Sequence, residues 1–257
     1  MDPRIELVMT LGAVAVGLVV GSFLNVVIHR VPRRLSIVRP GSACPACGEP
    51  IRWYDNVPVL SWIVLRARCR RCGAPIPVRY PAVELGGAIV ALLALHRWGW
   101  TVSGAEAALF GWVSLALALI DLEHKLLPDV MTLPSIAGGL AFSLAGGIAG
   151  PVDSALGAVV GAAIPATLIV VYRRLKGVEG MGWGDVKYLA AIGAVAGVMG
   201  CLRILVLAAV AGALTGIALI AAGRGSRETE LPFGTFLAAA ALFWLYAPPS
   251  WLAWIPW

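Results

Sequence analysis

The sequence predicts an all-α, polytopic membrane protein that crosses the bilayer about eight times. Of its 257 residues, 60% are hydrophobic and only 13% are charged, which leaves too few polar side chains to cover a water-soluble protein of this size. Apolar runs also recur that are long enough, at about 20 helical residues, to cross a hydrocarbon layer of about 30 Å. We expect transmembrane helices at residues 5–28, 81–97, 104–120, 130–148, 154–172, 186–202, 204–222 and 232–247.

Positive charge predicts the orientation of these helices. The segment between the first two spans is short and carries ten arginines, and short cytoplasmic loops are rich in Lys and Arg. With eight spans and both termini outside, only Arg4, Arg97 and Arg203 of the 20 Lys and Arg residues lie off the cytoplasmic side. This orientation also explains the net charge of +6, so we expect no nucleic-acid partner.

Three regions are expected along the chain. Residues 1–28 form the first span, which we expect to be retained because its amino-terminal flank is weakly charged and no small-x-small cleavage site follows. Residues 29–80 are polar, Pro-rich and Arg-rich, and too few to build a large hydrophobic core without a further staple. Residues 81–257 form a membrane-embedded region of about seven helices.

Four of the five cysteines lie in segment 29–80, in two Cys-x-x-Cys-Gly motifs. Cys44 and Cys47 form the first motif, and Cys69 and Cys72 form the second. Two such motifs can present four thiolates tetrahedrally, as structural Zn²⁺ sites do. Disulfides or a redox dithiol are the alternatives, but the expected cytoplasmic compartment is reducing. The sequence therefore predicts a small cytoplasmic zinc-binding domain between the first and second helices.

Two aspartates lie at the ends of predicted spans. Asp121 lies at the end of a span that runs toward the cytoplasm. The next two spans cross outward and return, and Asp185 begins the outward span that follows them. Both carboxylates are therefore expected at the cytoplasmic face. If they meet, mutual repulsion leaves one proton between them. The ionised member can then deprotonate a water while the protonated member polarises a peptide carbonyl.

Position alone leaves other interpretations of these acids open. An aspartate at a helix start can stabilise the helix dipole, and one at a helix end can lie in the membrane interface. Glu123 and Asp129 are rival carboxylates nearby, and Asp129 follows Pro128 in what could be an ordinary first helical turn. A transporter could use the acids as ion sites, although it would favour acids near mid-span. An assembly factor that docks partners through its cysteine domain would not need them.

Motifs along nearly the whole chain resemble those of type IV prepilin leader peptidases, membrane aspartyl proteases that also process type II secretion pseudopilins. The resemblance implies that Asp121, in an Asp-x6-Pro-Asp pattern, and Asp185, in a Gly-x-Gly-Asp pattern, are the catalytic pair. The motifs that carry it are Gly21–Arg30, the two cysteine motifs, Asn56–Trp62, Arg79–Glu84, Ile120–Asp129, Gly180–Lys187 and Leu231–Gly234.

The resemblance implies cleavage of a short basic leader beside the hydrophobic helix of a prepilin or pseudopilin. The active site would face the cytoplasm from a bacterial cytoplasmic (inner) membrane, with the lipid bilayer and the substrate as partners. Family members that carry the cysteine domain generally also methylate the new amino terminus, so S-adenosylmethionine is an expected methyl donor beside the structural zinc.

Other residues in these motifs have two interpretations each. Glu84 could contact the methyl donor or the leader, or could be a helix-start acid. Lys187 could act on the carboxylate of Asp185 or extend to the interface. Asn25 is expected to make an interhelical hydrogen bond. The residues best placed to attract a basic leader are Glu123, Asp129 and Glu179.

Overall fold

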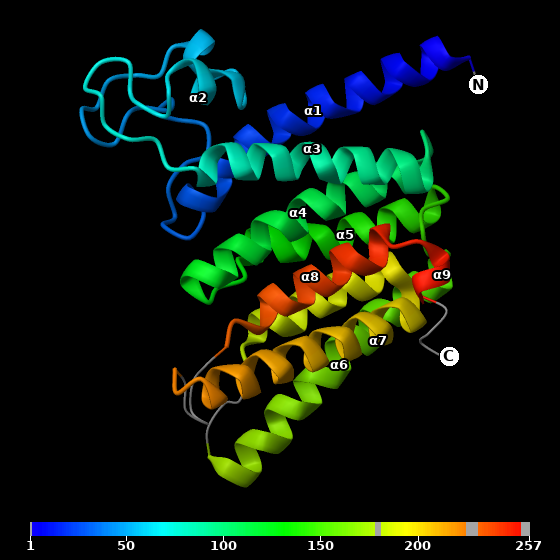
Figure 1. Cartoon of the computed structure of the whole chain (residues 1–257). Coiled ribbons are helices and arrows are strands. Elements are labelled where there is room, and N and C mark those ends of the chain that lie inside the picture. The colour runs from blue at the N-terminus through cyan, green and yellow to red at the C-terminus, as the bar shows by residue number, and fades with distance from the viewer. Residues whose placement is uncertain (1, 178–180, 225–230, 253–257) are drawn as a thin grey trace. The chain divides into compact units, whose positions relative to one another are not determined.

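The computed structural model describes residues 2–177, 181–224 and 231–252, and every regular element in these ranges is a helix (Figure 1). The all-α class is therefore confirmed. The chain divides into two compact units, Met1–Gly99 and Trp100–Trp257. The elements are α1 (Pro3–Arg30), the 3-10 helix η1 (Trp53–Asp55), α2 (Leu60–Val64), α3 (Arg79–Trp98), α4 (Val102–His124), α5 (Asp129–Leu144), α6 (Pro151–Lys176), α7 (Trp183–Ala221), α8 (Phe233–Tyr246) and α9 (Pro249–Leu252).

Among the described residues, four helices are long and apolar enough to cross a membrane, namely α1, α4, α6 and α7. The helices α5 and α8 are apolar but shorter. The helix α3 coincides with the expected second span, but Glu84, His96 and Arg97 interrupt its apolar run. The expected membrane protein is thus supported by four candidate spans, and the count of about eight is not confirmed.

In the first unit, α1 and α3 pack backbone to backbone through glycines (Figure 1). A methyl group on Gly17 would lie 2.6 Å from the Cα atom of Ala88, and one on Gly87 would lie 2.4 Å from the carbonyl oxygen of Gly17. The Asn25 amide donates to the carbonyl oxygen of Tyr80 at 3.1 Å, which is the interhelical hydrogen bond expected from sequence. Small residues permit this close approach where lipid gives helices little hydrophobic reason to associate.

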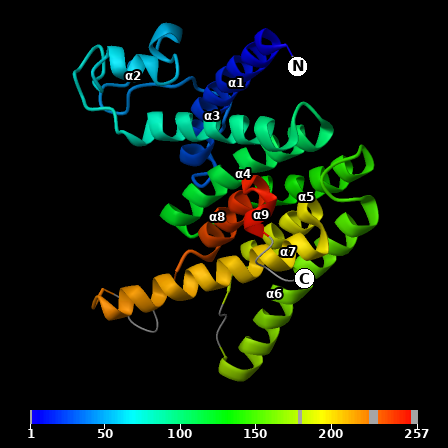
Figure 2. The same ribbon diagram turned by 45° about the vertical axis from the view of Figure 1, so that its right-hand side comes forward.

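In the second unit, α6 packs against α7 in the same manner (Figure 2). A methyl group on Gly157 would lie 2.2 Å from the carbonyl oxygen of Gly193, and one on Gly161 would lie 2.3 Å from that of Leu189. Three further helices pack into this bundle, since α5 packs on α7, and α8 packs on both α4 and α7. The bundle thus brings the start of α8 and the end of α4 together.

The sixth and seventh predicted spans lie in one element, α7, whose backbone is non-helical at Gly197 (φ 70°, ψ −175°). We expected the break near Arg203, so that boundary is wrong by several residues. Directly after the break, the N–H group of Val198 donates to the Asp153 carboxylate of α6 at 3.0 Å. A positive φ that glycine tolerates, together with an acceptor for the N–H group that follows it, sets the break at Gly197.

Gly197→Ala is expected to destabilise the second unit. An added Cβ atom would meet the Asp153 carboxylate oxygen at 2.0 Å, and the backbone conformation disfavours any side chain. We expect a loss of about 1–3 kcal/mol of stability, visible as a lower Tm in detergent micelles.

The matched control for this substitution is Gly138→Ala, because a Cβ atom at Gly138 meets nothing within 4 Å. Equal Tm values for the two variants would contradict the assigned role of Gly197.

Candidate functional site

Asp121 lies in the last turn of α4 with its carboxyl group turned toward the start of α8. The residue is 5% exposed. Its Oδ2 atom accepts a hydrogen bond from the backbone N–H group of Thr235 at 2.6 Å and another from the Thr235 hydroxyl group at 3.0 Å. The same hydroxyl group lies 3.1 Å from the carbonyl oxygen of Ala118. The first turn of α8 therefore holds one oxygen of the carboxylate.

Asp185 lies in the first turn of α7 and reaches the same region. Leu127, in the link between α4 and α5, packs against residues beside both aspartates. A methyl group on Gly184 would lie 3.0 Å from Cβ of Leu127, and one on Gly234 would lie 2.8 Å from Cδ1 of Leu127 and 3.0 Å from Cγ of Asp121. The two carboxyl groups are near enough to interact electrostatically. The structure thus brings together two aspartates that are distant in the sequence.

The rival acids lie differently. Both carboxylate oxygens of Asp129 accept hydrogen bonds from the Lys187 ammonium group at 2.7 Å. The Asp129 side chain is 56% exposed, and Glu123 is also exposed, with its Oε2 atom 3.9 Å from Nε2 of His124. Lys187 is therefore paired with Asp129 and not with Asp185. Two further predicted residues, Glu179 and Gly180, lie outside the described part of the chain.

Thr235 is a site residue that the sequence analysis did not identify. It follows directly on the Leu231–Gly234 motif, and a hydroxyl residue in the first turn of a helix after a proline was the available signal. The partner of that hydroxyl group, Asp121, lies 114 residues earlier in the chain. Only the packing of α8 on α4 makes the contact visible.

In the first unit, the two cysteine motifs have the same local geometry. The carbonyl oxygen of Cys44 accepts from the N–H group of Gly48 at 2.8 Å, and that of Cys69 accepts from Gly73 at 3.0 Å. Both glycines have a positive φ, 71° and 72°, which a side chain would strain. Each tight turn points two sulfur atoms to the same side.

The four Sγ atoms of these motifs lie within 4.8 Å of one another, and those of Cys44 and Cys72 are 3.8 Å apart. Tetrahedral zinc with Zn–S bonds of about 2.3 Å requires sulfur atoms about 3.8 Å apart. All four cysteines are free thiols. The donor set and its spacing therefore fit a closed tetrahedral metal site, formed by Cys44, Cys47, Cys69 and Cys72.

The thiols of this cluster do not ionise alike. The N–H groups of Cys72 and Arg71 lower the pKa of the Cys69 thiol to about 6. The N–H group of Glu49 favours ionisation of Cys47, but desolvation and hydrogen bonds with the other thiols outweigh it and raise the pKa of Cys47 to about 11. A divalent cation would remove this conflict, because it stabilises all four thiolates together.

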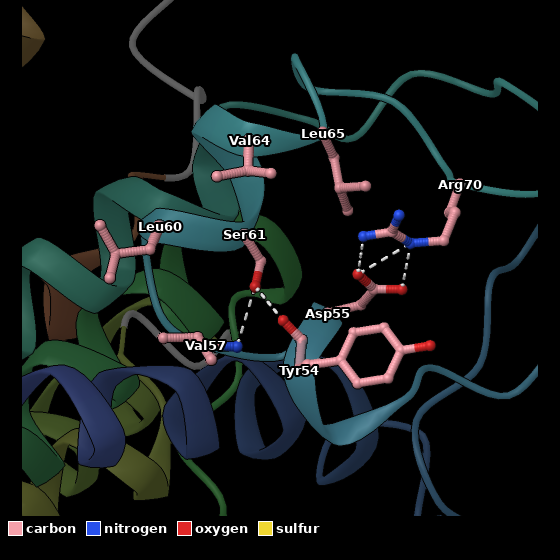
Figure 3. A pocket seen from close by; sticks show the side chains of 8 residues that line it. All are labelled: Tyr54, Asp55, Val57, Leu60, Ser61, Val64, Leu65 and Arg70. Atoms are coloured by element: carbon pink, nitrogen blue, oxygen red, sulfur yellow. Dashed lines mark hydrogen bonds and ion pairs between the residues drawn. The ribbon is translucent and has the colours of Figure 1, made fainter.

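The cysteine domain also contains a small cavity with polar contacts at its wall (Figure 3). The Asp55 carboxylate accepts from Nε of Arg70 at 2.9 and 3.0 Å, and the hydrogen bonds from Arg70 hold the pKa of Asp55 below its usual range. The Arg70 guanidinium also lies over the Tyr54 ring, 5.7 Å from its centroid. The cavity, of about 170 Å³, is lined by Tyr54, Asp55, Val57, Leu60, Ser61, Val64, Leu65 and Arg70.

Glu84 ties the cysteine domain to α3. Its side chain is buried, and its Oε2 atom accepts from the backbone N–H group of Val59 at 2.7 Å. Val59 precedes α2 with a positive φ of 63°, an unusual conformation for a β-branched residue. The carboxylate therefore holds the start of α2, a contact that the sequence analysis did not anticipate.

Comparison with known proteins assigns both units to one family. The model of the bacterial Peptidase A24 N-terminal domain matches residues 15–98, and that of the type IV leader peptidase family matches residues 108–217. The chain belongs to the type IV leader peptidase family, as relatives about 40% identical over most of its length also show. The resemblance described from sequence motifs is thereby confirmed, and the border between the two matches falls where the two compact units divide.

Relatives of this type IV leader peptidase carry the name prepilin leader peptidase/N-methyltransferase. One from Burkholderia pseudomallei (strain 1026b) is 40% identical over 91% of this chain and 84% of its own length. One from Aeromonas hydrophila is 41% identical over 88% of each chain. One from Myxococcus xanthus (strain DK1622) is 44% identical over 83% of this chain and 64% of its own. No solved structure matches.

Purified full-length protein is expected to contain about one zinc ion per chain, as a single closed four-sulfur site implies. Cys69→Ser should remove most of this zinc, because one thiolate ligand is lost and the remaining three hold the ion less tightly. Elemental analysis of the detergent-purified protein would measure both values.

Cys201→Ser serves as the control for zinc content, because Cys201 is buried in α7 and is not a member of the cluster. Zinc-free wild-type protein with all cluster thiols reactive would contradict the assignment.

Proposed function

We propose that this chain removes the basic leader of type IV prepilins or type II secretion pseudopilins with Asp121 and Asp185, and then methylates the new amino terminus. Membership of the type IV leader peptidase family and the names of the relatives support this activity. The observation that carries the proposal is that Asp121 of α4 and Asp185 of α7 lie in one region, where Leu127 packs against both Gly234, beside Asp121, and Gly184, beside Asp185.

The chemistry follows from two carboxyl groups that hold one proton. The ionised carboxylate takes a proton from water as the water oxygen bonds to the scissile carbonyl carbon. The other acid gives its proton to the carbonyl oxygen. When the C–N bond breaks, the first group returns its proton to the leaving amine and the second recovers its own. No metal and no covalent intermediate enters these steps.

The substrate is proposed to lie beside the turn that leads into α7. Gly182 is exposed and Gly184 is half-buried, so a peptide backbone could approach Asp185 closely there. For the basic leader, Glu123 and Glu179 remain candidate contacts. Asp129 is a weaker candidate than the sequence suggested, because the Lys187 ammonium group already offsets its charge.

The proposed location is the bacterial cytoplasmic (inner) membrane, with the aspartates at the cytoplasmic face. The four apolar helices support a membrane protein, and the ten arginines between the first two predicted spans support the orientation. The lipid bilayer and a prepilin with a hydrophobic helix are the proposed partners.

The cysteine domain is proposed to bind a structural zinc ion and to support methyl transfer. A closed four-sulfur site offers no position for substrate, so the metal would stabilise the fold of the domain. S-adenosylmethionine would supply the methyl group. Glu84 remains our candidate contact for this methyl donor, beside its hydrogen bond to Val59.

Asp121→Asn and Asp185→Asn are each expected to reduce prepilin cleavage by roughly 10³-fold or more, because paired catalytic groups act as a unit. Asp129→Asn should keep kcat within a few-fold, since its carboxylate is paired with the Lys187 ammonium group. Co-expression with a prepilin, followed by mass measurement of its amino terminus, reads out all three. Cleavage at the wild-type rate by either of the first two variants would rule out the paired-acid mechanism.

Cys72→Ser is expected to impair methyl transfer more than cleavage, because Cys72 belongs to the first unit whereas both aspartates belong to the second. The cleaved product should accumulate without its methyl group, as measured by mass. Equal loss of both activities in Cys72→Ser, with neither lost in Cys201→Ser, would instead indicate that the cysteine domain supports the whole enzyme.

A further inference from the structure

Asp121 and Asp185 have different hydrogen-bonding surroundings. The Oδ2 atom of Asp121 accepts from both the N–H group and the hydroxyl group of Thr235, at 2.6 and 3.0 Å. Asp185, at the start of α7, donates its own backbone N–H group to the carbonyl oxygen of Gly182 at 3.1 Å. Both donors to Asp121 come from one residue of α8, so Thr235 is the residue that holds this oxygen of Asp121.

We propose that Thr235 is a positioning residue that holds Asp121 by Oδ2, leaves Oδ1 for the attacking water, and thereby makes Asp121 the base and Asp185 the acid. This inference rests on the proposed peptidase function. Hydrogen bonds donated to a carboxylate favour its ionised form, and charge-assisted hydrogen bonds are the stronger kind. The free N–H groups in the first turn of α8 add a favourable dipole at the same oxygen.

The position of Thr235 is itself determined by close packing. Gly234 leaves so little room that an added methyl group would lie 3.0 Å from both Cγ and Oδ2 of Asp121. Pro232 precedes α8, and its fixed φ of −72° directs the chain into the helix. The side chain of Thr235 is β-branched and therefore has few rotamers, so its hydroxyl group is aimed with little loss of freedom.

The hydroxyl group can respond to the protonation state of Asp121. It has one hydrogen and two acceptors in reach, the Oδ2 atom of Asp121 and the carbonyl oxygen of Ala118 at 3.1 Å. While Asp121 is ionised, the hydrogen points to Oδ2. Once Oδ1 has taken a proton from water, the hydrogen can turn to Ala118. The contact is thus strongest in the state that acts as base.

During the reaction, the water oxygen bonds to the carbonyl carbon, one water proton goes to Oδ1 of Asp121, and the proton of Asp185 goes to the carbonyl oxygen. As the C–N bond breaks, Asp121 returns its proton to the leaving nitrogen and Asp185 recovers one from the hydroxyl group formed. The proton count balances, and Thr235 exchanges no proton with the substrate.

Thr235→Val tests the hydroxyl group, because valine has the same shape and lacks only that group. We expect kcat for prepilin cleavage to fall about 10- to 100-fold with KM nearly unchanged, since a donor to a catalytic carboxylate is lost. Thr235→Ser retains the hydroxyl group and should stay within a few-fold of the wild type. The matched control is Thr132→Val, because Thr132 is a buried threonine of the same unit whose hydroxyl group contacts only the backbone of Pro128.

Wild-type kcat in Thr235→Val would overturn the proposal, as would an equal loss in Thr235→Ser and Thr235→Val. If Thr235→Val has a lowered Tm in detergent, Thr235→Ala replaces it, and the serine variant must still exceed the alanine variant in kcat.

Asp121→Asn and Asp185→Asn are assayed alongside. If both abolish cleavage while Thr235→Val is fully active, only the role of Thr235 is wrong; if Asp121→Asn cleaves normally, the proposed function is wrong.

Discussion

The constraint on which the second unit depends is the placement of two acidic side chains within an apolar helical bundle. A carboxylate removed from water is unfavourable unless it receives hydrogen bonds or a counter-charge. Here the donors come from helix starts, where the first N–H groups have no partner within the helix. Asp185 lies in the first turn of α7, and Asp121 accepts from the first turn of α8. At the start of α8, an N–H group without a partner in its own helix thus donates to a buried carboxylate that needs a donor.

Glycine makes this arrangement possible. Where Gly234 faces Asp121 and Gly184 faces Leu127, the backbone itself forms the wall of the site. The same close approach recurs between α6 and α7 at Gly157 and Gly193, far from the aspartates. Association of helices in lipid depends on such packing, so the small residues that hold the bundle together also determine how near the two carboxylates come.

The cysteine domain follows a different physical principle. It has few buried apolar side chains, and its stability is expected to come from four thiolates around one metal ion, with ion pairs such as Asp55–Arg70 outside them. Its contacts with the helices of its own unit include the buried carboxylate of Glu84 in α3, which accepts from Val59 at 2.7 Å, and Arg30 of α1, which donates to the carbonyl oxygens of Ser36 and Gly41. A loss of metal would therefore affect this domain first and the helical pair α1 and α3 later.

The sequence by itself determined the helical class and the grouping of four cysteines, and it predicted the two aspartates as a pair, because apolar runs, Cys-x-x-Cys-Gly motifs and short acidic motifs are local features. Only the tertiary structure decided that Thr235 holds Asp121, that Lys187 pairs with Asp129, and that α7 breaks at Gly197 beside Asp153. The partners in these three contacts are separated by 114, 58 and 45 residues. No local pattern encodes such contacts, because each depends on how closely two distant helices pack.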